Sequence, residues 1–95
     1  MKVTSLEWDD HNIEHIARHG VSPQEVEEVC FGLHICMKER VDRYVLSGKT
    51  PDGRYLIVVI QRLHADAFRP ITAFDMSEDY RRLYKRRVER GRKSR

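Results

Sequence analysis

The sequence predicts a single α+β domain, in which a helical hairpin precedes an antiparallel meander sheet of three to four strands and a basic C-terminal helix. Three observations predict this class. Helix start and stop signals fill residues 9–32, the hydrophobic period changes to that of strands over residues 34–74, and a helical pattern returns after Ser77. We expect residues 1–90 to form the domain and the basic residues 91–95 to be a disordered tail.

The two helices of the hairpin are marked by their ends. The first is expected between a capping aspartate, Asp9 or Asp10, and Gly20, which favours a helix stop. The second begins with Ser-Pro-Gln-Glu at residues 22–25, because serine and glutamate form a capping box and proline suits the first helical position. We expect it to end near Gly32. Its buried face is predicted to contain Val26, Val29 and Cys30.

The middle of the chain predicts strands separated by turns. Residues 50–53 have the composition of a turn, because proline fixes φ and glycine accepts a positive φ. Residues 55–61 are nearly all apolar and β-branched, which predicts a central strand covered on both faces. In the last strand, Pro70 predicts an edge position or a bulge. The expected strands are residues 34–40, 43–48, 55–61 and 67–74, with a loop at residues 62–66.

The charge of the chain is divided unevenly along its length. Residues 80–95 contain nine Lys or Arg and one Glu, a net charge of +8, whereas residues 1–79 have a net charge of −5. A solvated tail would also be basic, but this surplus lies on a segment with its own helical pattern. We therefore interpret it as a phosphate-binding surface. The apolar stripe of this helix, which Ser77 is expected to cap, contains Tyr80, Leu83, Tyr84 and Val88.

Several classes of protein are disfavoured by the composition. The first residues lack the continuous apolar stretch of a signal peptide, and the longest apolar run, residues 55–60, is too short to cross a bilayer. The two cysteines, Cys30 and Cys36, do not have the spacing of a metal knuckle. We expect a cytoplasmic protein that has no membrane partner.

Several different short patterns follow one another along the chain in a characteristic order. They are Trp-Asp at residues 8–9, Arg-His-Gly-Val at 18–21, Arg-Tyr at 43–44, Gly-Arg at 53–54 and Arg-Pro-Ile-Thr-Ala at 69–73, followed by Arg81 and Tyr84. This ordered set spans residues 7–85 and resembles the BrnT family of ribonuclease toxins from type II toxin–antitoxin systems. The resemblance implies a RelE-like fold and a metal-independent endoribonuclease that cleaves RNA and inhibits translation and growth. It also implies a cognate antitoxin of the BrnA type, with a ribbon-helix-helix fold, through which alone the complex would bind operator DNA.

Cleavage of RNA without a metal requires a base for the 2′-hydroxyl, an acid for the leaving oxygen and a cation for the phosphorane. Arg69, which matches the family position, and Arg81 are candidates for the cation. Their alternatives are a pair with a neighbouring acid and a solvated helix face. His15 or His19 is a candidate general base, since histidine titrates near neutral pH. Tyr84 is a candidate proton donor or stacking group, with a core tyrosine as the alternative.

Other basic residues are candidates for contact with the RNA backbone. They flank the hairpin turn or lie on the last helix, and for each the alternative is a solvated surface charge. Histidines every four residues on the first helix raise the possibility of a metal, but no further ligand is evident, and we expect neither metal nor other cofactor. The candidates for RNA binding are Lys49, Arg54, Arg82, Lys85 and Arg86.

Two positions depart from the pattern of the family. Phe74 stands where a basic residue is expected, and Tyr80 stands where an acidic residue is expected before Arg81. If the basic and acidic groups at these two positions are catalytic in the family, this chain lacks them and is either a weak enzyme or one that uses other residues. The alternative function is a non-catalytic nucleic-acid-binding module of a toxin–antitoxin-like regulatory complex, and a third is an interaction domain whose basic segment meets an acidic protein.

Overall fold

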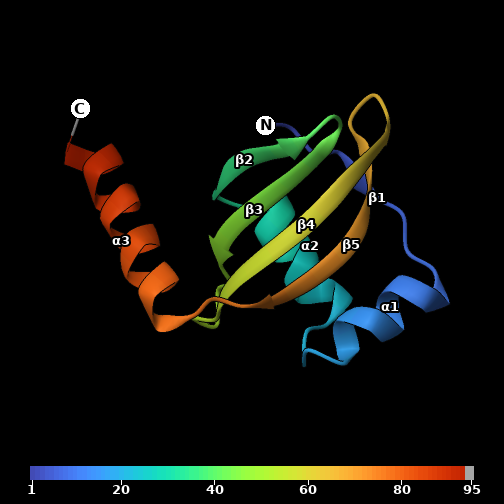
Figure 1. Ribbon diagram of the computed structural model, residues 1–95, viewed down its shortest axis with the longest axis horizontal. Coiled ribbons are helices and arrows are strands. Elements are labelled where there is room, and N and C mark those ends of the chain that lie inside the picture. The colour runs from blue at the N-terminus through green and yellow to red at the C-terminus, as the bar shows by residue number, and fades with distance from the viewer. Residues whose placement is uncertain (94–95) are drawn as a thin grey trace.

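The computed structural model describes residues 1–93, which form a five-stranded sheet and three helices (Figure 1). The strand order across the sheet is β1-β5-β4-β3-β2. The expected α+β class is therefore confirmed. The strands are β1 (Ser5–Leu6), β2 (His34–Arg40), β3 (Arg43–Lys49), β4 (Tyr55–His64) and β5 (Ala67–Asp75), and the helices are α1 (Asp10–Ala17), α2 (Pro23–Phe31) and α3 (Glu78–Lys93).

The sheet is mixed, which corrects the expected antiparallel meander of three to four strands. Strands β2 to β5 do form such a meander. However, β1 pairs with β5 in parallel, with Ser5 opposite Ala67 and Leu6 opposite Phe68. A strand of two residues is too short to show a hydrophobic period, so the sequence pattern could not reveal it.

Strand β4 is central, as expected, but it continues through the residues that were expected to form a loop. It ends at His64, and the chain turns back over Ala65, whose φ is +49°, and Asp66. Arg62 explains the extension, because its guanidinium lies over the ring of Phe68, 4.7 Å from the centroid. This contact stabilises an arginine within the strand and corrects the prediction of a loop at residues 62–66.

Pro70 lies where β5 has β4 as its only partner strand among the described residues, because β1 pairs with Ala67 and Phe68 alone. The pairing of β4 with β5 passes from Val59 opposite Thr72 to Ile60 opposite Pro70, which leaves Ile71 as an extra residue. A bulge and an unpaired strand edge both accommodate a residue that has no N–H to donate, so both of the expected features are observed at Pro70.

Helices α1 and α2 cover one face of the sheet, with α2 behind β3 and β4 in Figure 1. The capping box of Ser22 and Glu25 and the burial of the expected α2 residues are confirmed. The close approach of α2 requires Gly48, because a Cβ there would lie 2.9 Å from Cγ1 of Val29. The core between the helices and the sheet contains Ile16, Val26, Val29, Leu46, Leu56, Val58, Ile60 and Phe68.

Helix α3 stands beside the sheet and diverges from it toward its C-terminal end (Figure 1). Ser77 caps it as expected, with its Oγ accepting a hydrogen bond from the N–H of Tyr80 at 3.1 Å. Of the expected stripe, Tyr84 is buried, but Leu83 is 55% exposed. The helix runs to Lys93, so residues 91–93 of the expected disordered tail are helical, while residues 94–95 lie outside the described residues. Within residues 1–93, no helix has the length and apolarity needed to cross a membrane.

Candidate nucleic-acid interface

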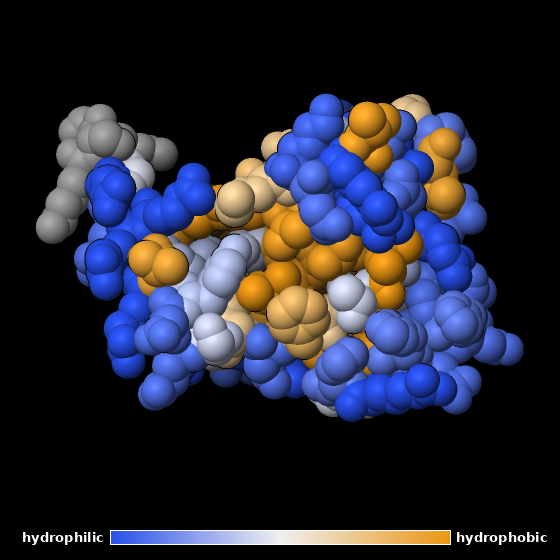
Figure 2. Space-filling model, in the orientation of Figure 1, coloured by the Kyte–Doolittle hydropathy of each residue, from blue (hydrophilic) through white to orange (hydrophobic). Residues whose placement is uncertain are grey.

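The face of the sheet opposite α1 and α2 is largely uncovered. Successive side chains of a strand point to opposite faces, so the cross-strand register identifies the residues on this face. Figure 2 shows an apolar patch in its middle, with hydrophilic surface on both sides. Two rows cross the patch; one contains Ile35, Ser47, Ile57 and Phe74, and the other contains Met37, Val45, Val59 and Thr72.

Polar and basic residues occupy the two ends of this face. At one end, Arg43, Gln61 and Arg69 lie opposite one another on β3, β4 and β5. At the other end, Lys49 pairs with Tyr55, beside the start of α3. The face therefore has an apolar centre with cations at both ends, an arrangement that suits a chain of bases and phosphates.

Three cations converge on the ring of Tyr55. The Nζ atoms of Lys49 and Lys85 lie 5.4 and 5.2 Å from its centroid, and Cζ of Arg81 lies at 5.5 Å. Within the described part of the chain, none of these cations forms an ion pair with a carboxylate. We call Lys49, Tyr55, Arg81 and Lys85 the Tyr55 cluster. Cations gathered without neutralising acids create a local positive potential that favours phosphate.

Tyr84 supports the Tyr55 cluster from within the fold. Its ring packs edge-on against that of Tyr55, with 6.0 Å between centroids, and its side chain is buried. Burial raises the pKa of the Tyr84 phenol, which favours the neutral hydroxyl. These contacts give Tyr84 a packing role, which was the expected alternative to proton donation.

Arg69 forms an ion pair with Asp9. Its guanidinium donates a hydrogen bond to the carboxylate of Asp9, the residue that caps α1. This hydrogen bond, with that from the N–H of Asn12, lowers the pKa of Asp9 from 3.8 to about 2. Arg69 is also distant from the Tyr55 cluster, because the β4 residue opposite it lies six residues from Tyr55, about 20 Å along the strand. The structure thus does not bring Arg69 and Arg81 together.

The candidate histidines lie at the same end of the sheet as the Tyr55 cluster. His15 and His19 contact each other edge-on, with centroids 5.6 Å apart, and His19 lies 6.2 Å from the ring of Phe74. Phe74 is the last residue but one of β5 and lies on the uncovered face opposite Ile57, two residues from Tyr55 on β4. Phe74 therefore contacts a candidate base, and Ile57 opposite it is on the same strand and face as Tyr55.

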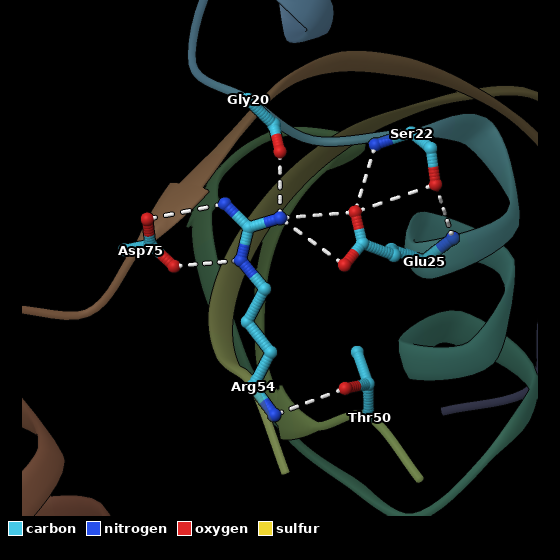
Figure 3. A network of polar contacts seen from close by, with 6 residues as sticks. All are labelled: Gly20, Ser22, Glu25, Thr50, Arg54 and Asp75. Atoms are coloured by element: carbon cyan, nitrogen blue, oxygen red, sulfur yellow. Dashed lines mark hydrogen bonds and ion pairs between the residues drawn. The ribbon is translucent and has the colours of Figure 1, made fainter. Parts of the chain in front are cut away.

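Arg54 is held inside the fold. All three of its side-chain nitrogens donate hydrogen bonds, which reach the carboxylates of Glu25 and Asp75 and the backbone oxygen of Gly20 (Figure 3). Its backbone N–H donates to Thr50 Oγ1 at 3.0 Å. Burial alone would raise the pKa of Glu25, but hydrogen bonds from Ser22 and Arg54 lower it. The network joins α2, the hairpin turn and the end of β5, which is a structural role.

The other basic residues of α3 that were candidates for RNA binding, Arg82 and Arg86, lie outside the Tyr55 cluster. Arg82 pairs with Asp79 at 3.1 Å, and both side chains are exposed. Arg86 does not join the Tyr55 cluster; it lines the opposite flank of α3 with Arg87 and Arg90. Among the described residues, no group of three or more His, Cys, Asp or Glu side chains is arranged to hold a metal ion.

Sequence reasoning missed Tyr55, around which the cluster forms, and the Asp9 partner of Arg69. Tyr55, Ile57 and Val59 alternate along one face of β4, whereas the nearly continuous apolar run predicts a strand covered on both faces. The largely uncovered face that carries Tyr55 corrects that prediction. The register that pairs Lys49 with Tyr55, and the position of α3 beside them, had no local signal.

The comparisons with known proteins give one structural likeness. No protein-family model matches the chain, and no curated protein matches it in sequence. The crystal structure of the Brucella abortus ribonuclease toxin BrnT superposes with a TM-score of 0.65 at 18% identity. The match covers 80% of this chain and 100% of that chain. The chain therefore has the fold of that toxin.

Proposed function

We propose that this chain is a ribonuclease toxin of the BrnT type, the toxin of a type II toxin–antitoxin pair. The observation that carries the proposal is the fold shared with the Brucella abortus ribonuclease toxin over the whole of that chain. The RelE-like character implied by the sequence resemblance, an antiparallel meander with helices packed against it, agrees with the arrangement of β2 to β5. On this proposal the chain acts in the cytoplasm on RNA and slows translation and growth.

The Tyr55 cluster is the proposed phosphate site. Lys49, Arg81 and Lys85 supply positive charge and hydrogen-bond donors to a phosphate whose negative charge grows in the transition state. The ring of Tyr55 holds the three cations on one side of the molecule. This arrangement would stabilise a phosphorane through side chains alone, in keeping with cleavage that needs no metal.

Proton transfer is assigned to His15 of α1 and to His19, in the turn that follows this helix. His19 is the first candidate for the base, because it lies against Phe74 at the end of the sheet where the Tyr55 cluster is found. His15 contacts His19 and is the second candidate. Arg69, paired with Asp9 at the far end of the uncovered face, is assigned to hold a more distant phosphate of the same RNA.

A non-catalytic nucleic-acid-binding module is the second candidate function. Two of the candidate catalytic groups are already engaged, since Tyr84 is buried and Arg69 is paired with Asp9. The cations of the Tyr55 cluster serve a binder as well as a nuclease. The two functions differ in whether RNA is shortened or only retained.

The experiment is induced expression of the wild-type chain and of an Arg81→Ala, Lys85→Ala variant, with growth and RNA integrity followed together. The matched control is Arg82→Ala, which removes an exposed arginine of the same helix that pairs with Asp79. Growth arrest with RNA loss in the wild type and the control, but not in the double variant at equal soluble expression, supports the proposal. Intact RNA and normal growth with folded wild-type protein would contradict it and favour the binding module.

A further inference from the structure

Helix α3 is attached to the body of the protein through only part of its length. Tyr80 hydrogen bonds to Ser47, and Tyr84 packs on Tyr55. Beyond Tyr84, only Val88 is even partly buried among the described side chains of the helix. The C-terminal half of α3 therefore stands clear of the sheet, and a groove opens between them (Figure 2).

Aliphatic side chains line the groove together with Ser47, Tyr80 and Tyr84. Ile35 and Met37 of β2 form one wall, and Leu83 of α3 forms the other, around a volume of about 300 Å³. Met37 is 51% exposed and Leu83 is 55% exposed, although both are large apolar side chains. Exposed apolar side chains that face each other across a hollow are typical of a surface that a partner covers.

The rim of the groove is basic. Arg86, Arg87 and Arg90 line it, and within the described residues none of them forms an ion pair. They lie on the flank of α3 opposite Arg81 and Lys85, because residues of a helix are spaced by about 100° around its axis. Tyr84 lies between the two flanks. The helix thus presents one set of cations to the Tyr55 cluster and a separate set to the groove.

We propose that this groove docks an acidic, amphipathic segment of a partner protein. Its aliphatic side chains would enter between Met37 and Leu83, and its carboxylates would pair with the arginines of the rim. A nucleic acid fits the groove less well, since bases stack on open aromatic faces. Of the two tyrosines in the lining, Tyr84 is buried, and Tyr80 is partly buried and hydrogen bonded to Ser47. The identity of the partner rests on the proposed function: if the chain is a toxin, the partner is its antitoxin.

The test is fluorescence anisotropy of the full chain with a labelled helical peptide. The peptide has leucines at positions i and i+4 on one face and glutamates around them. Two control peptides replace the leucines by serine or the glutamates by lysine. We expect the first peptide to bind, and each control peptide to bind at least about ten-fold more weakly. Equal binding of the serine peptide would overturn the proposal, because it would show attraction by charge alone.

Variants of the two flanks of α3 locate the site. We expect Arg87→Glu, Arg90→Glu and, separately, Leu83→Asp to abolish peptide binding, and Arg81→Glu, Lys85→Glu to leave it within about two-fold. All of the substituted side chains are exposed, and the buried Tyr84 is left intact. Circular dichroism checks that each variant is folded. Equal losses from both flanks, or displacement of the peptide by a single-stranded oligonucleotide, would overturn the proposal.

Two further measurements separate this proposal from others. Sedimentation of the chain alone, showing a dimer that Arg87→Glu, Arg90→Glu dissociates, would assign the groove to a second copy and overturn the proposal. RNA cleavage by the same variant is measured in parallel. Loss of peptide binding with normal cleavage supports docking at a site distinct from the nuclease, whereas peptide binding by a chain that never cleaves RNA sinks the proposed function alone.

Discussion

The hydroxyl of Tyr80 lies 2.8 Å from Oγ of Ser47, and this hydrogen bond fastens the first turn of α3 to the uncovered face of the sheet. Ser47 is almost fully buried, so its hydroxyl depends on this contact. Tyr80 occupies a position where the BrnT pattern leads one to expect an acid. The residue that departs from the pattern thus sets the position of the helix on which Arg81 and Lys85 lie.

Replacing Tyr80 by phenylalanine should destabilise the fold by about 1 kcal/mol, because the buried Ser47 hydroxyl loses its partner. Urea unfolding of Tyr80→Phe measures the change. Ser47→Ala alone and combined with Tyr80→Phe completes a double-mutant cycle. A coupling energy of zero would contradict the assigned hydrogen bond.

Arg54→Lys should destabilise the fold by about 2 kcal/mol, since a single ammonium cannot bridge Glu25, Asp75 and Gly20 as the guanidinium does. Thermal and urea unfolding measure the loss. The matched control, Arg82→Lys, alters an exposed pair and should change stability by less than about 0.5 kcal/mol. Similar small effects for both variants would show that the network in Figure 3 contributes little.

The free energy of unfolding should decrease in acid, in part because the carboxylate of Asp9 becomes protonated. Its pKa is lowered from 3.8 to about 2 in the folded chain, first by the hydrogen bond from Arg69. A lowered carboxyl pKa contributes stability that is present above the unfolded value and lost as pH falls through the folded value. This contribution should therefore disappear between about pH 4 and about pH 2.

Urea midpoints over that pH range, for the wild type and Arg69→Gln, check the assignment. The variant should lose less stability on acidification, because its Asp9 has a pKa closer to the ordinary value. Parallel pH curves for the two proteins would exclude the Asp9–Arg69 pair as the source.

His19→Gln should slow RNA cleavage by at least about 100-fold while leaving RNA affinity unchanged, because glutamine keeps a polar side chain but transfers no proton. Cleavage rates under single-turnover conditions and RNA binding by anisotropy are measured together. His11→Gln, which alters an exposed histidine of the preceding helix α1, is the matched control. Full activity of His19→Gln would contradict this role and leave His15 or another group as the base.

The sequence predicted those elements whose signals are local. The capping box of Ser22 and Glu25, the turn at residues 50–53 and the bulge at Pro70 all follow from the conformational preferences of a few adjacent residues. Strand β1 was missed because two residues carry no period. The extension of β4 was missed because it depends on Arg62 lying over Phe68 of the neighbouring strand, a pairing that no local pattern indicates.

The candidate site was only partly predictable, for the same physical reason. Lys49, Arg81 and Lys85 were identified singly from charge, but their convergence on Tyr55 depends on strand register and on the path of α3. The sequence makes Arg54 a candidate for RNA contact because it flanks the hairpin turn, with a solvated charge as the alternative. No pattern in the sequence indicated that Glu25 and Asp75 would enclose it.

Cleavage of single-stranded RNA by the purified chain in excess EDTA tests the central claim most directly. The account predicts that the wild type and Arg82→Ala shorten the RNA, and that the folded Arg81→Ala, Lys85→Ala variant does not. RNA that is bound but left intact by the wild type would contradict the claim of metal-independent cleavage, and the Tyr55 cluster would then be a binding surface only.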